Sequence, residues 1–198
     1  MSAASFRQAW HRHYPNFEPV GYELLHAGAR PWIRFHSLPK SKRYADTETE
    51  WRELLARQNE LASAVLGEDQ KCWLVQSAWE LTPGVTDYAF QNGNDPFRAI
   101  TDHSLESAII TVRDQGTEDE RRWEACAGLT TWASGRFDQL LRQIANDQAA
   151  PTLWLSHDTG SVFAPYDGGV DLFLPDERMV TALAERYPGW LSAHPSGL

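Results

Sequence analysis

Thr152–Ala164 reads TLWLSHDTGSVFA, and this stretch decides the fold. Two short runs rich in β-branched and aromatic residues flank His157–Gly160, a sequence that favours a tight turn. So short a connection joins antiparallel strands, because parallel strands need a long crossover. The stretch therefore predicts a β-hairpin inside an antiparallel or mixed sheet.

Other segments of the chain share the strand-like composition of this hairpin. They are Val20–Leu25, Pro31–His36, Cys72–Trp79, Ala108–Val112, Trp123–Trp132 and Val170–Leu174. His26–Arg30 is short and contains glycine, so it predicts a second hairpin between the first two of these strands. Residues 83–104 are predicted to form a long polar loop, and residues 114–122 an exposed hairpin tip.

Four segments have the apolar spacing of amphipathic helices. One spans about Ser5 to Tyr14, and another begins at the capping box Thr47–Glu50 and stops at Gly67. A third carries apolar residues over 137–145 with Ser134 as its predicted cap, and the last begins after Pro175 and ends at Pro188. The order of elements predicts one α+β domain over residues 1–198, with about four helices packed against the sheet.

Several classes of protein are disfavoured by what the chain lacks. A linker is absent, and no apolar run approaches the roughly 20 residues that a membrane-spanning helix requires. The amino terminus has no apolar segment behind a basic start, which predicts a cytoplasmic location. Cys72 and Cys126 lie in separate apolar stretches, so we expect neither a disulfide nor a metal site, and no motif predicts a cofactor.

The net charge of −9 is distributed unevenly along the chain. Residues 1–45 contain seven Lys or Arg and two acidic residues, a net charge of +5, so the remainder carries −14. This polarity suggests a large acidic face that would repel nucleic acid and attract a basic partner. The alternative is that the acidic residues only keep the surface soluble.

Trp32–Tyr44 is the extended basic stretch of the sequence. Arginine forks and lysine point charges beside aromatic rings are typical of a site for a phosphate or an acidic partner loop. The alternative is a solvent-facing strand followed by a basic loop. The candidate residues for binding an anion or a partner are Trp32, Arg34, His36, Lys40, Lys42 and Arg43.

Tyr166–Asp171 reads YDGGVD and is the second unusual stretch. Its two glycines permit a tight turn that would place Asp167 and Asp171 near each other, where carboxylates can act as acid and base. His157 is the imidazole candidate for such chemistry, with His103 as a second choice. The alternative is that Asp167 accepts hydrogen bonds from the amides of its own turn.

Nine tryptophans are a large number for 198 residues. Their size and their indole N–H groups resist complete burial, so some are expected at a groove or an interface. The expected interface residues are Trp10, Trp32, Trp79, Trp132 and Trp190.

The carboxyl-terminal third resembles a bacterial family, domain-of-unknown-function family 3885. The resemblance rests on Arg136–Leu141, Ile144–Asp147, the strand pair, the Tyr166–Asp171 turn and a closing helix to Trp190, within residues 134–191. Members of that family often read Tyr-Asp-Asp-Arg-Gly where this chain has Tyr166-Asp167-Gly168-Gly169, so no role of the second acid or of the arginine carries over. The resemblance implies an uncharacterised bacterial cytoplasmic protein without established catalytic residues.

Two functions from different classes follow. The first is a protein that binds a partner, such as an immunity-type inhibitor of a basic toxin domain, indicated by the acidic charge, the tryptophans and the lack of a catalytic motif. The alternative is a small hydrolase or nucleotide-processing enzyme that uses the aspartates and histidines with an arginine clamp. Binding of nucleic acid through residues 30–44 is disfavoured by the overall charge.

Overall fold

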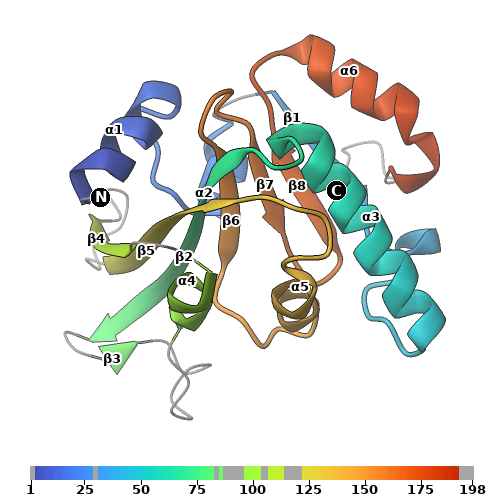
Figure 1. The fold of residues 1–198 in the computed structure, drawn as a ribbon, viewed down its shortest axis with the longest axis horizontal. Helices are drawn as coiled ribbons and strands as arrows, with labels where there is room; N and C mark the ends of the chain where they lie inside the picture. Colours follow the sequence, from blue (N-terminus) through green and yellow to red (C-terminus); the bar gives the residue numbers. More distant parts are fainter. Residues whose placement is uncertain are drawn as a thin grey trace.

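The computed structural model describes residues 3–28, 31–82, 85–86, 96–103, 107–113 and 122–191. Its strands are β1 (Trp32–His36), β2 (Lys71–Thr82), β3 (Val85–Thr86), β4 (Ser107–Arg113), β5 (Arg122–Thr131), β6 (Thr152–Ser156), β7 (Val162–Pro165) and β8 (Gly169–Phe173). They form one sheet in the order β1-β8-β7-β6-β2-β5-β4, with β3 paired to β2 (Figure 1). Every described pairing is antiparallel, and the predicted 152–164 hairpin is confirmed as β6 and β7.

Six α-helices are found within the described residues. They are α1 (Ala3–His13), α2 (Gly21–Ala27), α3 (Glu48–Leu66), α4 (Arg98–His103), α5 (Asp138–Ala145) and α6 (Glu177–Arg186), with 3-10 turns at Pro39–Ser41 and Pro188–Trp190. The predicted α+β class is confirmed, and α2 and α4 are additional to the four helices expected. The capping box of α3 is present as predicted, because Thr47 accepts from the Glu50 amide and Glu50 accepts from the Thr47 amide.

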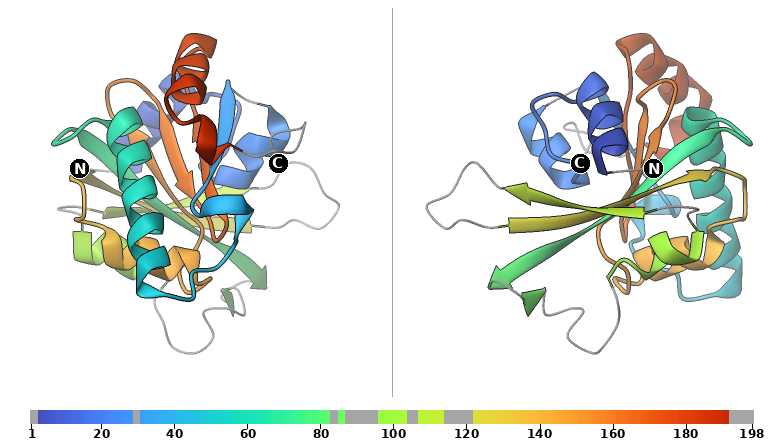
Figure 2. Two further views of the ribbon diagram at one scale, coloured as in Figure 1. Left: turned by 90° about the vertical axis from the view of Figure 1, so that its right-hand side faces the viewer. Right: turned by 60° about the vertical axis from the view of Figure 1, so that its left-hand side comes forward.

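Helices cover both faces of the sheet, so its central strands are buried on both sides (Figure 2). Alternate residues of β2 point to opposite faces: Cys72 and Leu74 join one core, and Trp73 and Val75 join the other. The first core packs against α3, α5 and α6, whereas the second packs against α1 and α2. Figure 1 shows α1 on the left of the sheet and α3 and α6 on the right.

The predicted strand Val20–Leu25 is wrong, because this segment forms α2. Val20 and Leu24 are both buried in the second core, and the Leu24 amide donates to the Val20 carbonyl at 3.2 Å. That spacing of four residues is helical, although a short apolar run alone does not separate a helix from a strand. The helix ends at Gly28 in the left-handed conformation, so the predicted hairpin at His26–Arg30 instead connects a helix to β1.

Two further predictions are corrected or restricted. Ser134 does not cap α5, which begins at Asp138 after a turn; the Ser134 amide donates to Glu68 Oε1 at 2.8 Å. The predicted 83–104 loop contains β3 and α4, and its remaining residues lie outside the described ranges, as does the tip at residues 114–121. Both cysteines are free and buried. Among the described residues, no helix is both long and apolar enough to cross a membrane.

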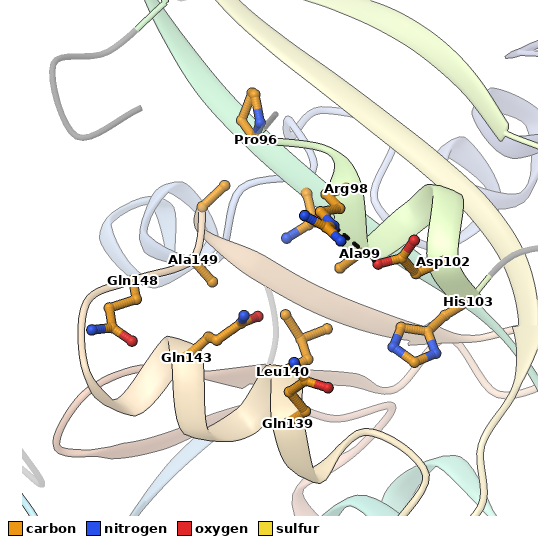
Figure 3. Close-up of a pocket in the computed structure, with 12 residues that line it drawn as sticks. Pro96, Arg98, Ala99, Asp102, His103, Gln139, Leu140, Gln143, Gln148 and Ala149 are labelled. Atoms are coloured by element: carbon orange, nitrogen blue, oxygen red, sulfur yellow. Dashed lines mark hydrogen bonds and ion pairs between the residues drawn. The ribbon is translucent and has the colours of Figure 1, made fainter. Parts of the chain in front are cut away.

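A cavity of about 250 Å³ lies between α4 and α5, on the face of the sheet that carries the first core (Figure 3). Its lining includes Gln76 of β2 and the 148–150 segment after α5.

Candidate functional site

The pairing of β1 with β8 brings together the two stretches that the sequence marks as unusual. In the register of these strands, Arg34 is opposite Asp171 and His36 is opposite Gly169. Gly169 is required here, because a Cβ at this position would lie 2.2 Å from the Phe35 carbonyl oxygen of β1. Trp32–Tyr44 and Tyr166–Asp171 therefore form one cluster, which we call the β1–β8 cluster.

Arg34 and Asp171 form the centre of the cluster. The arginine binds the carboxylate through two hydrogen bonds, Nε to Oδ1 at 2.7 Å and Nη2 to Oδ2 at 2.8 Å. Trp32 Nε1 donates to the same Oδ1 at 3.0 Å, and the guanidinium lies 4.8 Å from the centre of the Tyr166 ring. The hydrogen bond from Asp171 raises the pKa of Arg34, and burial raises the pKa of Tyr166 to about 12. Asp171 is thus occupied by an arginine and an indole, which leaves it poorly placed to act as a base.

Asp167 is also occupied. It is buried, forms an ion pair with Arg43 and accepts a hydrogen bond from the Tyr44 hydroxyl at 3.0 Å. The Tyr44 hydroxyl also lies 3.1 Å from Asp147 Oδ2. The partners of Asp167 thus come from the 37–47 loop and not from the amides of its own turn, so that alternative is wrong.

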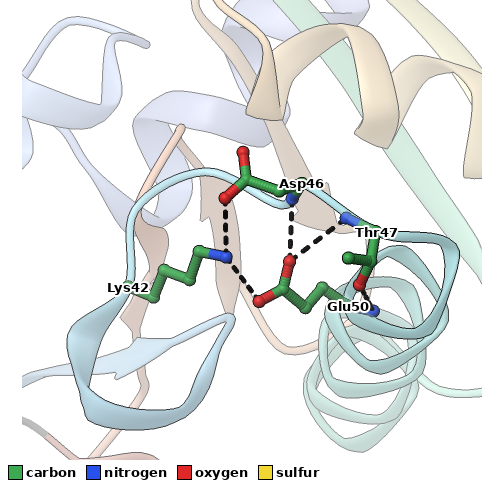
Figure 4. A network of polar contacts seen from close by, with 4 residues as sticks. All are labelled: Lys42, Asp46, Thr47 and Glu50. Carbon is green, nitrogen blue, oxygen red and sulfur yellow. Dashed lines mark hydrogen bonds and ion pairs between the residues drawn. The ribbon is translucent and has the colours of Figure 1, made fainter.

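The lysines of the basic stretch do not join Arg34. Lys42 Nζ lies 2.9 Å from Asp46 Oδ2 and 2.5 Å from Glu50 Oε1, in front of the α3 capping box (Figure 4). This contact lowers the pKa of the Glu50 carboxyl. Lys40 is exposed and has no ion-pair partner among the described residues. The basic stretch is therefore largely neutralised by the protein itself, which weakens its interpretation as an anion clamp.

The histidine candidates lie apart from the two aspartates. His157 is in the β6–β7 turn, next to Asp158 at 2.9 Å, whereas Asp167 is in the turn at the other end of β7. His103 is on α4, where its ring contacts Phe137. Only His36 lies in the cluster; burial lowers its pKa, and its Nε2 has no hydrogen-bond partner within the described part of the chain. Carboxylate and imidazole therefore do not converge in the way that the hydrolase hypothesis requires.

Comparison with protein families adds one finding. A family model described as "Domain of unknown function (DUF3885)" matches residues 20–195. The chain belongs to the DUF3885 family. The match extends well beyond the motifs at 134–191 and includes both halves of the β1–β8 cluster. Searches of curated proteins and of solved structures gave no significant match.

The tryptophans of this DUF3885 domain are mostly structural. Trp10 and Trp132 are buried, which corrects their assignment to an interface. Trp132 stacks on Phe137 at 5.3 Å, and Trp190 stacks on Tyr187 at 4.5 Å. The side chain of Trp79 is outside the described part. Within that part, the exposed large hydrophobic side chain is Tyr44, at 44% exposure.

Metal binding has no candidate among the residues that the structure describes. No group of three or more His, Cys, Asp or Glu side chains there is arranged to hold an ion.

A groove along α3 was not predicted from the sequence. Its lining includes Leu55 and Ala56, three carboxylates and one arginine; the charged residues are Arg52, Glu60, Glu68 and Asp138. The sequence marked α3 only as a capped amphipathic helix, because the residues after Gly67 and those before α5 meet only in the folded chain. The hydrogen bond from the Ser134 amide to Glu68 is one contact between these two segments.

The charges of the α3 groove are only partly compensated. Glu60 accepts from Arg186 and from the Tyr187 hydroxyl, both at 2.7 Å. Glu68 accepts from neutral groups alone, and neither it nor the adjacent exposed Asp69 has a cationic partner in the described structure. The last turn of α3 contains no basic residue, so the partial negative charge of the helix terminus adds to these carboxylates.

Proposed function

We propose that this DUF3885 protein binds a partner protein and acts as an inhibitor, capturing a basic partner such as a toxin domain in the α3 groove. The observation that carries the proposal is the pair of carboxylates, Glu68 and Asp69, which follow the carboxyl end of α3 and have no cationic partner among the described residues. Arginine or lysine side chains of a partner would supply the missing charge.

The shape of the groove supports the same proposal. Leu55 and the exposed Ala56 line the groove beside its three carboxylates, which outnumber Arg52 there. Interfaces commonly combine an apolar centre with a polar rim, and complementary charge there speeds association. The net charge of −14 outside residues 1–45 would act in the same direction over a longer range.

An enzyme remains the second candidate from the sequence, but no described geometry favours it. The cluster that would supply acid and base is closed by Arg34 and Arg43, and His157 lies at the other end of β7. The inhibitor proposal is therefore the one that the site supports best.

Binding measurements with two double variants test the proposal. The protein is used to capture partners from a lysate of its host, and the Kd of the purified pair is measured at low and high salt. We expect a basic partner whose binding weakens as salt screens the charges. E68Q/D69N removes two charges but keeps the hydrogen-bonding shape, and asparagine tolerates the positive φ of Asp69. We expect it to weaken binding by about 5- to 30-fold, the range for two exposed charges.

The control is E177Q/E185Q, which removes two exposed carboxylates from α6. This variant should leave the Kd within about twofold of the wild-type value, as is usual for charges outside an interface. An acidic partner, capture of no basic protein at low salt, or equal weakening by both double variants would contradict the proposal. Inhibition is tested separately by adding the protein to an activity assay of the captured partner.

A further inference from the structure

The cavity between α4 and α5 is lined mainly by polar but uncharged groups. Four of the described lining residues are glutamines: Gln76, Gln139, Gln143 and Gln148. Figure 3 shows the side chains of Gln143 and His103 extending toward the space between the two helices. Such a lining differs from the apolar interior on the same face of the sheet, which suggests a use other than packing.

Gln76 at the base of this cavity has an unused hydrogen-bond acceptor. The residue is 2% exposed, and its Oε1 has no partner among the described residues. Its Nε2 donates to Thr152 Oγ1 at 3.2 Å, and that hydroxyl donates to the Ala150 carbonyl at 2.6 Å. Because the hydroxyl hydrogen is already committed, Thr152 must accept from Gln76, which fixes the orientation of the amide. The free oxygen is therefore an acceptor without a donor in the described structure, and it is closed off from solvent, so a ligand reaches it only by displacing a neighbouring side chain.

The charged groups of the lining cancel one another. Arg98 Nε lies 3.4 Å from Asp102 Oδ2 one turn away on α4. Burial, together with the nearby Arg136, lowers the pKa of His103, which disfavours its charged form. A ligand with a net charge would find no uncompensated partner among these residues.

We propose that the cavity binds a small neutral polyol, of the monosaccharide class, with Gln76 Oε1 accepting from one of its hydroxyl groups. A hydroxyl both donates and accepts, which matches a lining in which carboxamide oxygens and N–H groups are mixed. The volume of about 250 Å³ suits a molecule of this size, slightly below the range of drug-sized pockets. The apolar lining residues are small or aliphatic, such as Ala99, Leu140 and Ala149, so the imidazole of His103 is the one flat ring in the described lining.

Calorimetric titration of the full chain tests this proposal. The probes are D-glucose, D-galactose, D-mannose and D-ribose, with D-glucose 6-phosphate and D-glucosamine as charged analogues and uracil and adenine as planar ones. We expect saturable binding of at least one neutral sugar. We expect its charged analogue to bind about tenfold more weakly, because one charge would be desolvated without a partner.

Three variants connect binding to the cavity. Gln143 is exposed, and its side chain has no hydrogen-bond partner in the described part of the chain, so Q143A should fold normally and weaken sugar binding about three- to tenfold, the loss of one hydrogen bond. Q76L should weaken it by about tenfold or more, because a buried donor of the ligand is then left unpaired. Q8A, an exposed glutamine of α1, is the matched control and should bind like the wild type.

The proposal is overturned by any of three results. One is the absence of saturable binding of every neutral sugar to the wild type below about 10 mM, a concentration that corresponds to a very weak complex. Another is a sugar Kd for Q76L and for Q143A that equals the Kd for the control Q8A. The third is tighter binding of uracil or adenine than of any sugar, which would assign the cavity to a planar ligand.

Discussion

The β1–β8 cluster and the cavity between α4 and α5 treat their polar groups in opposite ways. In the cluster, Asp171 is paired with Arg34 and Asp167 with Arg43, so each buried carboxylate has its own cation. In the cavity, Gln76 is as deeply buried as these aspartates, yet its Oε1 has no partner in the described structure. The carboxylates of the cluster are paired within the fold, although His36 Nε2 there also lacks a partner in the described structure, whereas the buried amide at the cavity keeps its acceptor unpaired.

This difference shows that charge in a sequence is a weak indicator of a binding site. Arg34 and Asp171 attract attention because they are charged, but the fold uses them to join β1 to β8. The glutamines of the cavity carry no charge and belong to no motif, yet one of them, Gln76, holds a buried acceptor that is unpaired in the described structure. Unsatisfied hydrogen-bonding capacity, which only the folded chain reveals, is the more informative property.

Replacing Asp171 with alanine should cause the largest loss of stability. It leaves the Arg34 guanidinium with its side chain only 15% exposed and without its anion, and it removes the acceptor of Trp32. We expect the free energy of unfolding to fall by about 3 kcal/mol, since removing one partner of a buried ion pair leaves the other uncompensated. Urea denaturation measures the effect. The control is D158A, whose carboxylate is 73% exposed. An equal loss in both variants would show that the Arg34–Asp171 pair stabilises the fold no more than an exposed carboxylate does.

Replacing Gly169 with alanine tests how closely the two strands of the cluster approach. The new Cβ would lie 2.2 Å from the Phe35 carbonyl oxygen, and a backbone atom cannot move aside cheaply. We expect a loss of about 2 kcal/mol, within the range for overpacked sites. At Gly189 a Cβ meets nothing within 4 Å, so G189A should be close to neutral in the same thermal or urea unfolding measurement. A neutral G169A would mean that β1 and β8 are further apart than described.

Most of the fold was predictable because its signals are local. The capping box at Thr47, the 152–164 hairpin and the helix after Pro175 each depend on residues within a few positions of one another. The 20–25 segment failed for a physical reason. Val20 and Leu24 face the same core one helical turn apart, but six residues of mixed composition fit a strand equally well.

The site was less predictable because its parts are distant in sequence. The sequence marked both halves of the β1–β8 cluster, yet the contact of Arg34 with Asp171 spans a separation of 137 residues. No local pattern reports the register of such a pair. Gln76 lies within the predicted strand Cys72–Trp79, and nothing around it in the sequence signals that its amide oxygen lacks a partner in the described structure.

Replacing Gln76 with leucine should have a small effect on stability, in contrast to the same change at Asn59. Gln76 uses one of its hydrogen-bonding groups, so an apolar residue of similar size removes an unpaired acceptor and one weak bond. We expect a change within about 1 kcal/mol, of either sign. Asn59 donates to Asp138 at 2.7 Å and accepts from the Gly135 amide at 2.8 Å, so N59L should cost about 2 kcal/mol. Urea denaturation of both variants decides; a larger loss for Q76L would mean that its oxygen has a partner in solution.

The smallest effect expected is a dependence of stability on pH that both regions share. Burial lowers the pKa of His36 in the cluster; the hydrogen bond with the Gly168 backbone opposes this shift, and Arg34 and Arg57 add to it. Burial also lowers the pKa of His103 at the cavity, where Arg136 adds to the shift and Asp102 opposes it. Because these pKa values lie below the ordinary 6.5 of the unfolded chain, the unfolded state takes up protons first as the pH falls. The contribution of these two histidines to the free energy of unfolding is therefore fully present above pH 6.5. It declines below that pH until the histidines of the folded state also take up protons. H36N and H103N should each flatten the decline in urea midpoints measured between pH 7 and 5. A wild-type profile that is level over this interval would show that both imidazoles are better solvated than their burial implies.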